Sequence, residues 1–159
     1  MTAKHVTASL RSGHDDLDEW LRSSSLHADA SGTGRTWVWT SDGTTVIAYY
    51  TLAPHVVRRD DVPRKTGRGS PDVIPAILLA RLALDATLHG RGLRGVLLAD
   101  ALARAYDGIR IVGGRLIVVD AIDDAAAGFY EHHGFARTPS NPDRLVIKAS
   151  DVEASLRKA

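Results

Sequence analysis

The first third of the chain alternates apolar positions with polar turns in a way that predicts a helix and a hairpin. Residues 15–26 carry apolar side chains at helical spacing, with acidic residues leading and a basic residue following, which favours a helix. Residues 36–40 and 45–52 flank the turn Ser41-Asp42-Gly43-Thr44. Their composition is typical of two strands joined by a tight turn. We therefore expect a helix followed by a β-hairpin.

The middle of the chain changes from proline-rich to apolar. Residues 54–75 contain four prolines and two glycines, which predicts a long loop with at most a short strand near Val56. Residues 77–85 form an apolar run that only Arg81 interrupts, as in a buried central strand. A glycine-rich turn follows, and residues 96–106 then repeat apolar side chains at helical spacing.

The last third of the chain predicts a strand, a helix and two closing strands. Residues 115–119 are mostly β-branched, which indicates a strand. Residues 123–133 have helical spacing, with Asp123 placed as N-cap and Gly134 placed to end the helix in a left-handed conformation. Residues 135–138 and 144–148 are typical of strands. Helices and strands in this order predict an α/β fold, a mixed β-sheet flanked by helices.

Length and composition fit one soluble domain. The 159 residues, 44% of them hydrophobic, are enough for a single domain, residues 1–159, with its own core. The absence of cysteine excludes disulfides, thiolate zinc sites and a cysteine nucleophile. No apolar stretch reaches the roughly 20 residues that span a bilayer, and the first ten residues do not have the apolar core of a signal peptide. We expect a cytoplasmic protein that does not enter membranes.

Positive charge is concentrated in one segment although the formal net charge is only +1. Two acids, Asp60 and Asp61, lie within that segment. Its five cations are Arg58, Arg59, Arg64, Lys65 and Arg68. Such a segment steers an anionic partner even when the whole molecule is nearly neutral. A solvated loop with ordinary surface arginines is the alternative, and the sequence leaves both open.

The turn His89-Gly90-Arg91-Gly92-Leu93-Arg94-Gly95 lies between the apolar strand and a helix. Glycines there let backbone amides approach a ligand, and the positive end of the helix favours a phosphate. The same letters match the dinucleotide fingerprint G-x-G-x-x-G. Three features count against a dinucleotide-binding fold: a spacer before the first glycine, a hairpin that precedes the strand, and only 64 residues after Gly95. The adjacent His132 and His133 diverge on a helix, so we predict no metal site.

Three stretches resemble GNAT-superfamily N-acetyltransferases over nearly the whole chain. Residues 89–94 are similar to the Gln/Arg-x-x-Gly-x-Gly/Ala sequence that follows the central strand of this superfamily, with departures at His89 and Arg94. Residues 125–135 are similar to its closing helix and Phe-Tyr-Glu-x-x-Gly-Phe sequence. Residues 74–85 resemble the Pro-x-Leu-Leu-x-Arg-Leu-Ala-Val-Asp stretch of GNAT toxins from bacterial type II toxin–antitoxin pairs.

The resemblance implies a GNAT-like fold, acetyl-CoA as cofactor and a set of site residues. Backbone of Leu82, Ala83 and Leu84 would pair with pantetheine, and Tyr130 would protonate the leaving thiolate, although core packing is the alternative for this side chain. Arg94 stands where the superfamily has a small residue that lets the chain approach the pyrophosphate. Either Gly95 takes over this role one position later, or the Arg94 side chain contacts a phosphate. The other implied cofactor-binding residues are His89, Gly90, Arg91, Gly92, Leu93, Arg94, Gly95, Asp123, Ala126 and Phe129.

The acceptor is inferred from the shortage of a general base. Asp120 and Asp123 are candidates, but strand-end and capping roles explain them equally well. About a quarter of an α-amine is neutral near pH 7.4, against about 0.1% of a lysine, so a missing base favours an α-amine. The toxin resemblance implies aminoacyl-tRNA as acceptor, the basic segment on its phosphates, a ribbon-helix-helix antitoxin and a homodimer. Alternatives are acetylation of a protein N-terminus or a small amine, and a non-enzymatic binding module.

Overall fold

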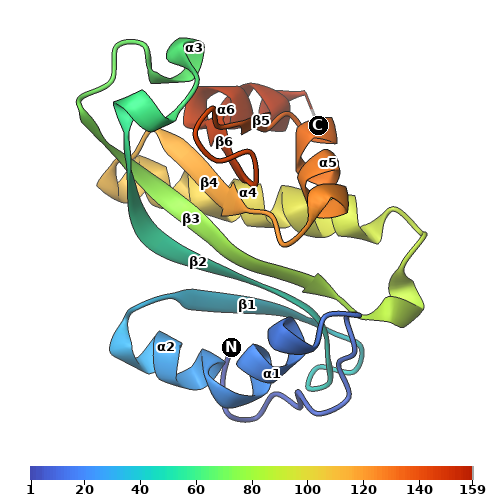
Figure 1. Ribbon diagram of the computed structural model, residues 1–159. Helices are drawn as coiled ribbons and strands as arrows, with labels where there is room; N and C mark the ends of the chain where they lie inside the picture. Colours follow the sequence, from blue (N-terminus) through green and yellow to red (C-terminus); the bar gives the residue numbers. More distant parts are fainter. Residues whose placement is uncertain (159) are drawn as a thin grey trace. The chain divides into compact units, whose positions relative to one another are not determined.

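The computed structural model describes residues 1–158, and the chain divides into two compact units. The first unit comprises Met1–Ala53 and Ala80–Ala101. The second comprises Pro54–Leu79 and the segment from Leu102 onward. Figure 1 labels the helices and strands of both. Each unit buries its own cluster of apolar side chains.

The first unit contains two short helices and a hairpin. The helices are α1 (Asp15–Ser23) and α2 (Ser25–Ser31), and the strands are β1 (Arg35–Thr40) and the first part of β2 (Val46–Arg58). The prediction of one continuous helix over residues 15–26 is wrong, because Ser24 has φ −126° and interrupts the helix. The predicted hairpin is confirmed by antiparallel pairing of β1 with β2.

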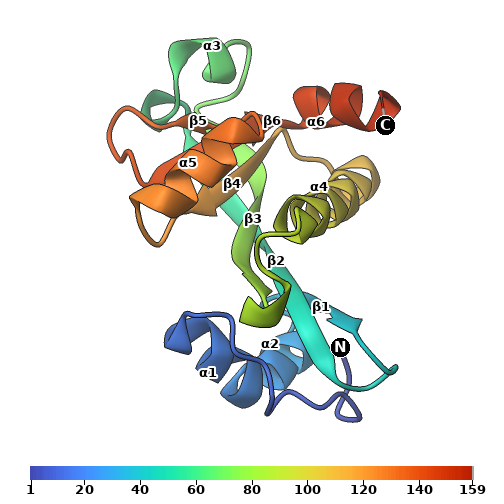
Figure 2. The ribbon, with the colours of Figure 1, turned by 90° about the vertical axis from the view of Figure 1, so that its right-hand side faces the viewer.

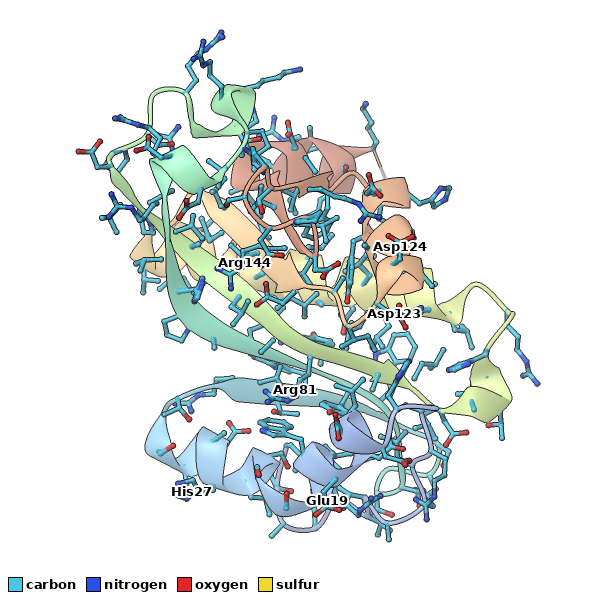
Figure 3. All side chains as sticks on the ribbon, in the orientation of Figure 1. Glu19, His27, Arg81, Asp123, Asp124 and Arg144 are labelled. Atoms are coloured by element: carbon cyan, nitrogen blue, oxygen red, sulfur yellow. The ribbon has the colours of Figure 1, made fainter. Side chains whose placement is uncertain are left out.

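Aromatic packing fastens α1 to the strands of this unit. The rings of Trp20 and Tyr49 stack with centroids 6.1 Å apart. The guanidinium of Arg81, which Figure 3 labels, lies 3.9 Å from the Trp20 ring centroid. The Tyr49 hydroxyl donates a 2.6 Å hydrogen bond to the Leu17 carbonyl. Burial raises the pKa of Tyr49 above its ordinary value, so the phenol stays protonated and keeps donating. Helix α1 is therefore held in a fixed place against β2.

The loop predicted over residues 54–75 is shorter than expected at both ends, and the short strand expected near Val56 is confirmed as the end of β2. Strand β2 continues to Arg58, and β3 (Val73–Leu84) begins before the predicted strand. The connection between them contains the 3₁₀ turn η1 (Arg59–Asp61) and the short helix α3 (Arg64–Gly67). Val57 and Ile74 are both buried in the core of the second unit. Burial of these side chains overrides the loop propensity of the neighbouring prolines.

The second unit is built around the later strands. Its elements are β4 (Leu116–Asp120), α5 (Asp124–His132), β5 (Ala136–Arg137), β6 (Arg144–Lys148) and α6 (Ala149–Arg157). β3 pairs parallel with β4, whereas β6 pairs antiparallel with both β4 and β5. The strand order β1-β2-β3-β4-β6-β5 makes a six-stranded mixed sheet and confirms the predicted fold class.

Helices cover the sheet of the second unit. In Figure 2, α5 and the second half of α4 (Leu93–Val112) lie on opposite faces of β4. The helix α4 extends beyond the predicted residues 96–106 at both ends. Within residues 1–158, no helix is both long enough and apolar enough to traverse a bilayer.

Candidate active site

The turn between β3 and α4 has the backbone of an anion site. After β3 the chain forms the 3₁₀ turn η2 (Ala86–Leu88) and then passes through Gly90 and Gly92, whose φ angles are +78° and +73°. A Cβ at either glycine would have no atom within 4 Å, so the turn faces open space. Because α4 begins at Leu93, the N–H groups and the positive end of the helix dipole follow the glycines directly. This arrangement suits a phosphate or pyrophosphate.

His89 closes the turn against the strand that precedes it. Its Nε2 lies 2.8 Å from the Leu84 carbonyl oxygen, which requires the proton on Nε2, and its backbone N–H donates to the Ala86 carbonyl. His89 stands where the superfamily sequence has glutamine or arginine. In this chain its side chain therefore fixes the geometry of the turn relative to the end of β3.

One cavity of about 220 Å³ brings together two predicted groups of cofactor residues. The predicted residues that line it are Leu82, Ala83, Leu84, His89, Gly90, Gly92 and Arg94. Arg91, Leu93 and Gly95 do not line it. Gly95 lies inside α4 without a positive φ, whereas Arg94 lies on the cavity wall. A position on the wall is what a contact between Arg94 and a phosphate requires.

Sequence reasoning missed the third wall of this cavity, which Ser12, His14 and Leu17 supply. The buried Asp18 carboxylate holds this segment by accepting hydrogen bonds from the Ser12 hydroxyl at 2.6 Å and the Ser12 N–H at 3.1 Å. A serine six residues before an acid at a helix start was a weak signal. The contact of this segment with the glycine turn and the end of β3 is visible only in the folded chain.

The end of β3 is tied to the same segment by Asp85. Its carboxylate accepts from the Arg11 N–H and from both the N–H and the hydroxyl of Thr87. Partial burial alone would raise the pKa of Asp85, but the hydrogen bonds from Thr87 and Arg11 hold the pKa below its ordinary value. The carboxylate thus stays ionised and keeps two walls of the cavity in register.

Helix α5 carries the predicted catalytic tyrosine in the second unit. As predicted, Asp123 is the N-cap, and its Oδ1 accepts a 2.7 Å hydrogen bond from the Ala126 N–H. Gly134 ends the helix with φ +96°, also as predicted. Tyr130 is 5% exposed, and its ring packs edge-on against Phe129 and Phe135 with centroids 5.2 and 5.5 Å away. The aromatic contacts orient the ring.

The prediction that the adjacent His132 and His133 diverge on a helix is wrong. The ring centroids of His132 and His133 are 5.1 Å apart at a right angle, because His133 lies beyond the last helical residue with φ −95° and ψ 17°. Burial and the neighbouring His132 lower the pKa of His133. Within residues 1–158, no group of three histidine, cysteine or acidic side chains is arranged to hold a metal ion.

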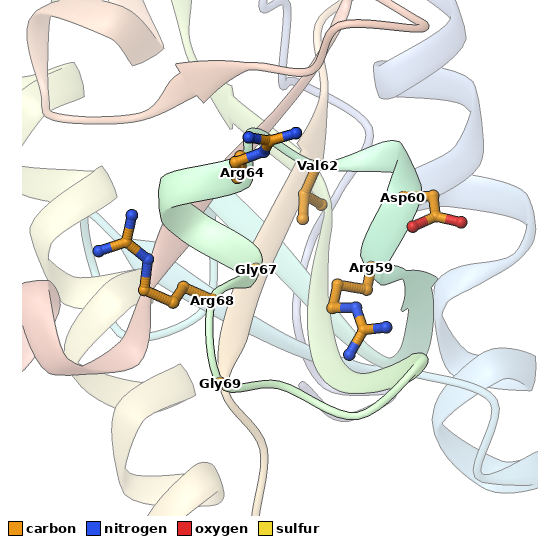
Figure 4. Close-up of a pocket in the computed structure, with 7 residues that line it drawn as sticks. All are labelled: Arg59, Asp60, Val62, Arg64, Gly67, Arg68 and Gly69. Atoms are coloured by element: carbon orange, nitrogen blue, oxygen red, sulfur yellow. The ribbon is translucent and has the colours of Figure 1, made fainter.

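The five cations of the basic segment divide into two roles. The Arg59 guanidinium donates to the Ser70 carbonyl at 2.9 Å and pairs with Asp72 at 2.6 Å, so it fastens the connection between β2 and β3. Arg58, Arg64, Lys65 and Arg68 are exposed. Figure 4 shows Arg59, Arg64 and Arg68 around an open cavity of about 460 Å³. The segment therefore displays its positive charge around a concave surface.

A cluster of one arginine, one aspartate and one histidine lies across the strands of the same unit. Arg144, labelled in Figure 3, donates from Nε and Nη2 to the two oxygens of Asp120 at 2.7 and 2.8 Å. Its Nη1 lies 3.3 Å from Nε2 of His55. Burial, with the adjacent Arg144 charge, lowers the pKa of His55. Asp120, a candidate general base from the sequence, is thus committed to an ion pair.

Comparisons with known proteins identify the family. No protein-family model matches the chain. The chain is 38% identical over 146 residues to the tRNA-acetylating toxin of Mycobacterium tuberculosis (strain ATCC 25618 / H37Rv), covering 92% of this chain and 87% of that protein.

Solved structures share the fold along almost the whole chain. One is AtaT complexed with acetyl-methionyl-tRNAfMet, with a TM-score of 0.89, 24% identity, and coverage of 98% of this chain and 94% of that one. Another is a mutant AtaT toxin bound to the C-terminus of the antitoxin AtaR and acetyl-CoA, with a TM-score of 0.84, 22% identity and the same coverage. The chain belongs to the GNAT family of tRNA-acetylating toxins of toxin–antitoxin systems.

Proposed function

We propose that this protein transfers the acetyl group of acetyl-CoA to the α-amino group of an aminoacyl-tRNA and thereby blocks translation. The observation that carries the proposal is the 38% identity, over 92% of the chain, to a tRNA-acetylating toxin. The cavity between the glycine turn and the end of β3 supplies the matching chemistry, because it combines the end of a strand with an anion site. The proposed catalytic domain comprises residues 1–159.

Each part of the chain has a defined task in the proposed reaction. Acetyl-CoA supplies the acetyl group as a thioester. Backbone of Leu82, Ala83 and Leu84 binds the pantetheine arm, and the amides around Gly90 and Gly92 bind the pyrophosphate, with Arg94 adding charge. The Tyr130 hydroxyl gives its proton to the sulfur that leaves when the amine nitrogen bonds to the acetyl carbon. The amine releases its own proton to water, which restores the tyrosine.

The two candidate bases are both engaged, which supports an α-amine acceptor. Asp120 pairs with Arg144, and Asp123 caps α5. An acceptor that needs no dedicated base must be partly neutral at physiological pH. An α-amine with a pKa of about 7.7–8.0 meets this condition, whereas a lysine with a pKa of about 10.4 does not.

Exposed cations of the basic segment bind the phosphates of the tRNA in this proposal. Arg58, Arg64, Lys65 and Arg68 are exposed and lie in the second unit with Tyr130. Arg59 has a mainly structural task, since both its guanidinium contacts lie within the same connection. Backbone contacts of this kind raise affinity for tRNA without selecting a sequence.

Replacing Tyr130 with phenylalanine tests the proposed proton donor. The ring keeps its contacts with Phe129 and Phe135, so the fold and acetyl-CoA binding should be unchanged. Turnover should fall by about 10²–10⁴-fold, the usual contribution of a positioned acid. Activity is measured with charged tRNA and acetyl-CoA affinity by calorimetry. Equal turnover in the variant would remove Tyr130 from the mechanism.

Charge reversal tests the basic segment. Arg64, Lys65 and Arg68 changed together to glutamate should weaken tRNA binding and lower the slope of log affinity against log salt by about 2–3, since each phosphate contact contributes roughly 0.7–0.9. The matched control changes Lys4, Arg110 and Lys158, also exposed, to glutamate. Equal loss in both triple variants would show a general charge effect and contradict the assignment.

The proposed partners follow from the same family. AtaT has been solved bound to the C-terminus of its antitoxin AtaR, which supports an antitoxin partner for this chain. We extend the proposal to an antitoxin of the ribbon-helix-helix type, to a homodimer, and to the cytoplasm, where aminoacyl-tRNA is found. Acetylation of a protein N-terminus or a small amine, with no transfer to charged tRNA, would replace the proposal.

A further inference from the structure

A further cavity, partly lined by the basic segment, lies within the second unit. Its volume is about 280 Å³, smaller than the 300–1,000 Å³ of most drug-sized ligand sites, which suits a single small ring system. Val56, Val57 and Val62 give it apolar wall, and the segment after β5 gives it a polar rim with Ser140 and Asn141. None of these residues belongs to the proposed cofactor or catalytic set.

Two arginines line this cavity with different properties. The Arg144 guanidinium is held by both oxygens of Asp120, so its charge is balanced and its plane is fixed. A fixed guanidinium plane is a surface on which an unstacked nucleobase packs. Arg58, by contrast, is exposed and is the first cation of the basic segment. It is suited to the phosphate of a nucleotide whose base enters the cavity.

Asn141 and Asp61 offer this cavity a donor and an acceptor for the edge of a base. The Asn141 Oδ1 accepts from the Asp143 N–H, which leaves the Asn141 amide N–H groups, and these donate to no other group within residues 1–158. Asp61 contributes a carboxylate to the same cavity. Cytosine and adenine each present a ring-nitrogen acceptor beside an exocyclic amino donor, whereas guanine and uracil present an N–H at that ring position. The pair therefore fits cytosine or adenine.

The rim is rigid and fastened to the helix that carries Tyr130. The Thr138 hydroxyl and the Arg144 N–H both donate to the Asn141 carbonyl, at 2.6 and 3.0 Å. Arg137, one residue before Thr138, pairs with Asp124 and Glu131 on α5 at 3.0 and 2.8 Å. A ligand in this cavity is thus held by the same rigid body as the proposed proton donor.

We propose that this cavity binds an unpaired cytosine or adenine of the single-stranded 3′ end of the acceptor tRNA, between the Arg144 guanidinium and the Asn141–Asp61 edge. The inference rests on the proposed function, because it names the part of the tRNA that the second unit holds. Every tRNA ends in unpaired C-C-A next to the esterified amino acid. Binding one of these bases positions the α-amine without reading the rest of the tRNA sequence.

The test combines binding and kinetics with the full chain. The uncharged trinucleotide C-C-A should shift the NMR signals of the Asn141 side-chain amide and of Arg144 Nε, and G-G-U should bind at least about fivefold more weakly. Asn141→Ala should weaken C-C-A binding about fivefold, in line with one hydrogen bond. Ser155→Ala, exposed on α6, is the control and should bind as wild type.

Kinetics separate this site from the proposed function. With charged tRNA, Asn141→Ala should raise KM about fivefold and leave kcat unchanged, while the methyl ester of the same amino acid should show no difference. Equal binding of C-C-A and G-G-U, or an unchanged KM of Asn141→Ala for charged tRNA, would overturn the proposed base site. The proposed function would still stand in that case if the wild-type protein acetylates charged tRNA. Specific C-C-A binding without any acetylation of charged tRNA would uphold the site and contradict the function.

Discussion

Replacing Gly92 with alanine separates the strain in the glycine turn from its role in binding. Gly92 has φ +73°, and a Cβ there would meet no atom within 4 Å. The loss of stability therefore comes from the left-handed backbone alone, about 1–2 kcal/mol. The smaller entropy of the unfolded alanine chain offsets about 0.4–1 kcal/mol. We expect a net loss of about 1 kcal/mol in the free energy of unfolding.

Gly43 is the matched control, because it also has a left-handed φ, +88°, and open space around its Cα, but lies in the β1–β2 hairpin. Gly43→Ala should lose a similar 1 kcal/mol. Acetyl-CoA at 100 times its Kd should stabilise wild type and Gly43→Ala by about 2.7 kcal/mol. If the new methyl keeps the pyrophosphate off the Gly92 amide and weakens binding about tenfold, the same acetyl-CoA concentration should stabilise Gly92→Ala by only about 1.4 kcal/mol.

Urea unfolding followed by tryptophan fluorescence, with and without acetyl-CoA, measures both quantities. The slope of the free energy against urea should be the same for all three proteins, since none of the changes alters the surface exposed on unfolding. An equal gain on adding acetyl-CoA in Gly92→Ala and Gly43→Ala would refute the placement of the pyrophosphate at this turn.

Two further predictions concern the second unit. Asp123→Ala should lower the free energy of unfolding by about 1 kcal/mol, since it removes the N-cap of α5. Asp123→Ser should keep most of that stability, because serine also caps helices. Equal losses of unfolding free energy in the two variants, measured in urea, would contradict the capping role. The pKa of His55 is lowered in the folded state, so folding favours its neutral form. The free energy of unfolding should therefore be highest at high pH and should decline as the pH falls below about 6.5, the ordinary pKa of histidine in the unfolded chain. Arg144→Gln should raise the NMR titration midpoint of His55, and an unchanged midpoint would rule out Arg144 as a cause.

Local patterns were sufficient where a segment's own residues decide its conformation. The hairpin followed from the turn at Gly43, and α5 followed from its cap Asp123 and its left-handed Gly134. The glycine turn could be placed because glycines and a helix start are adjacent in sequence. The mixed sheet followed from the order of these elements.

Features that depend on distant residues could not be predicted. Strands β2 and β3 extend past Pro54 and Pro75 because Val57 and Ile74 are buried together. Helix α6 escaped notice because only Ala149 and Val152 of its residues are buried, which leaves almost no apolar period.

The same limit applies to the candidate sites. The Ser12 wall of the proposed cofactor cavity and the Arg144 cluster join residues dozens of positions apart. No local spacing signals such a pairing, so only the folded chain reveals it.

Transfer of labelled acetyl from acetyl-CoA to total bacterial tRNA tests the proposed function most directly. The reaction is run with charged and with uncharged tRNA, and the Tyr130→Phe variant is the matched control. We predict label in charged tRNA only, lost on mild alkaline deacylation, and little label with the variant. No label in charged tRNA from a protein that binds acetyl-CoA would contradict the proposal and direct attention to a protein N-terminus or a small amine.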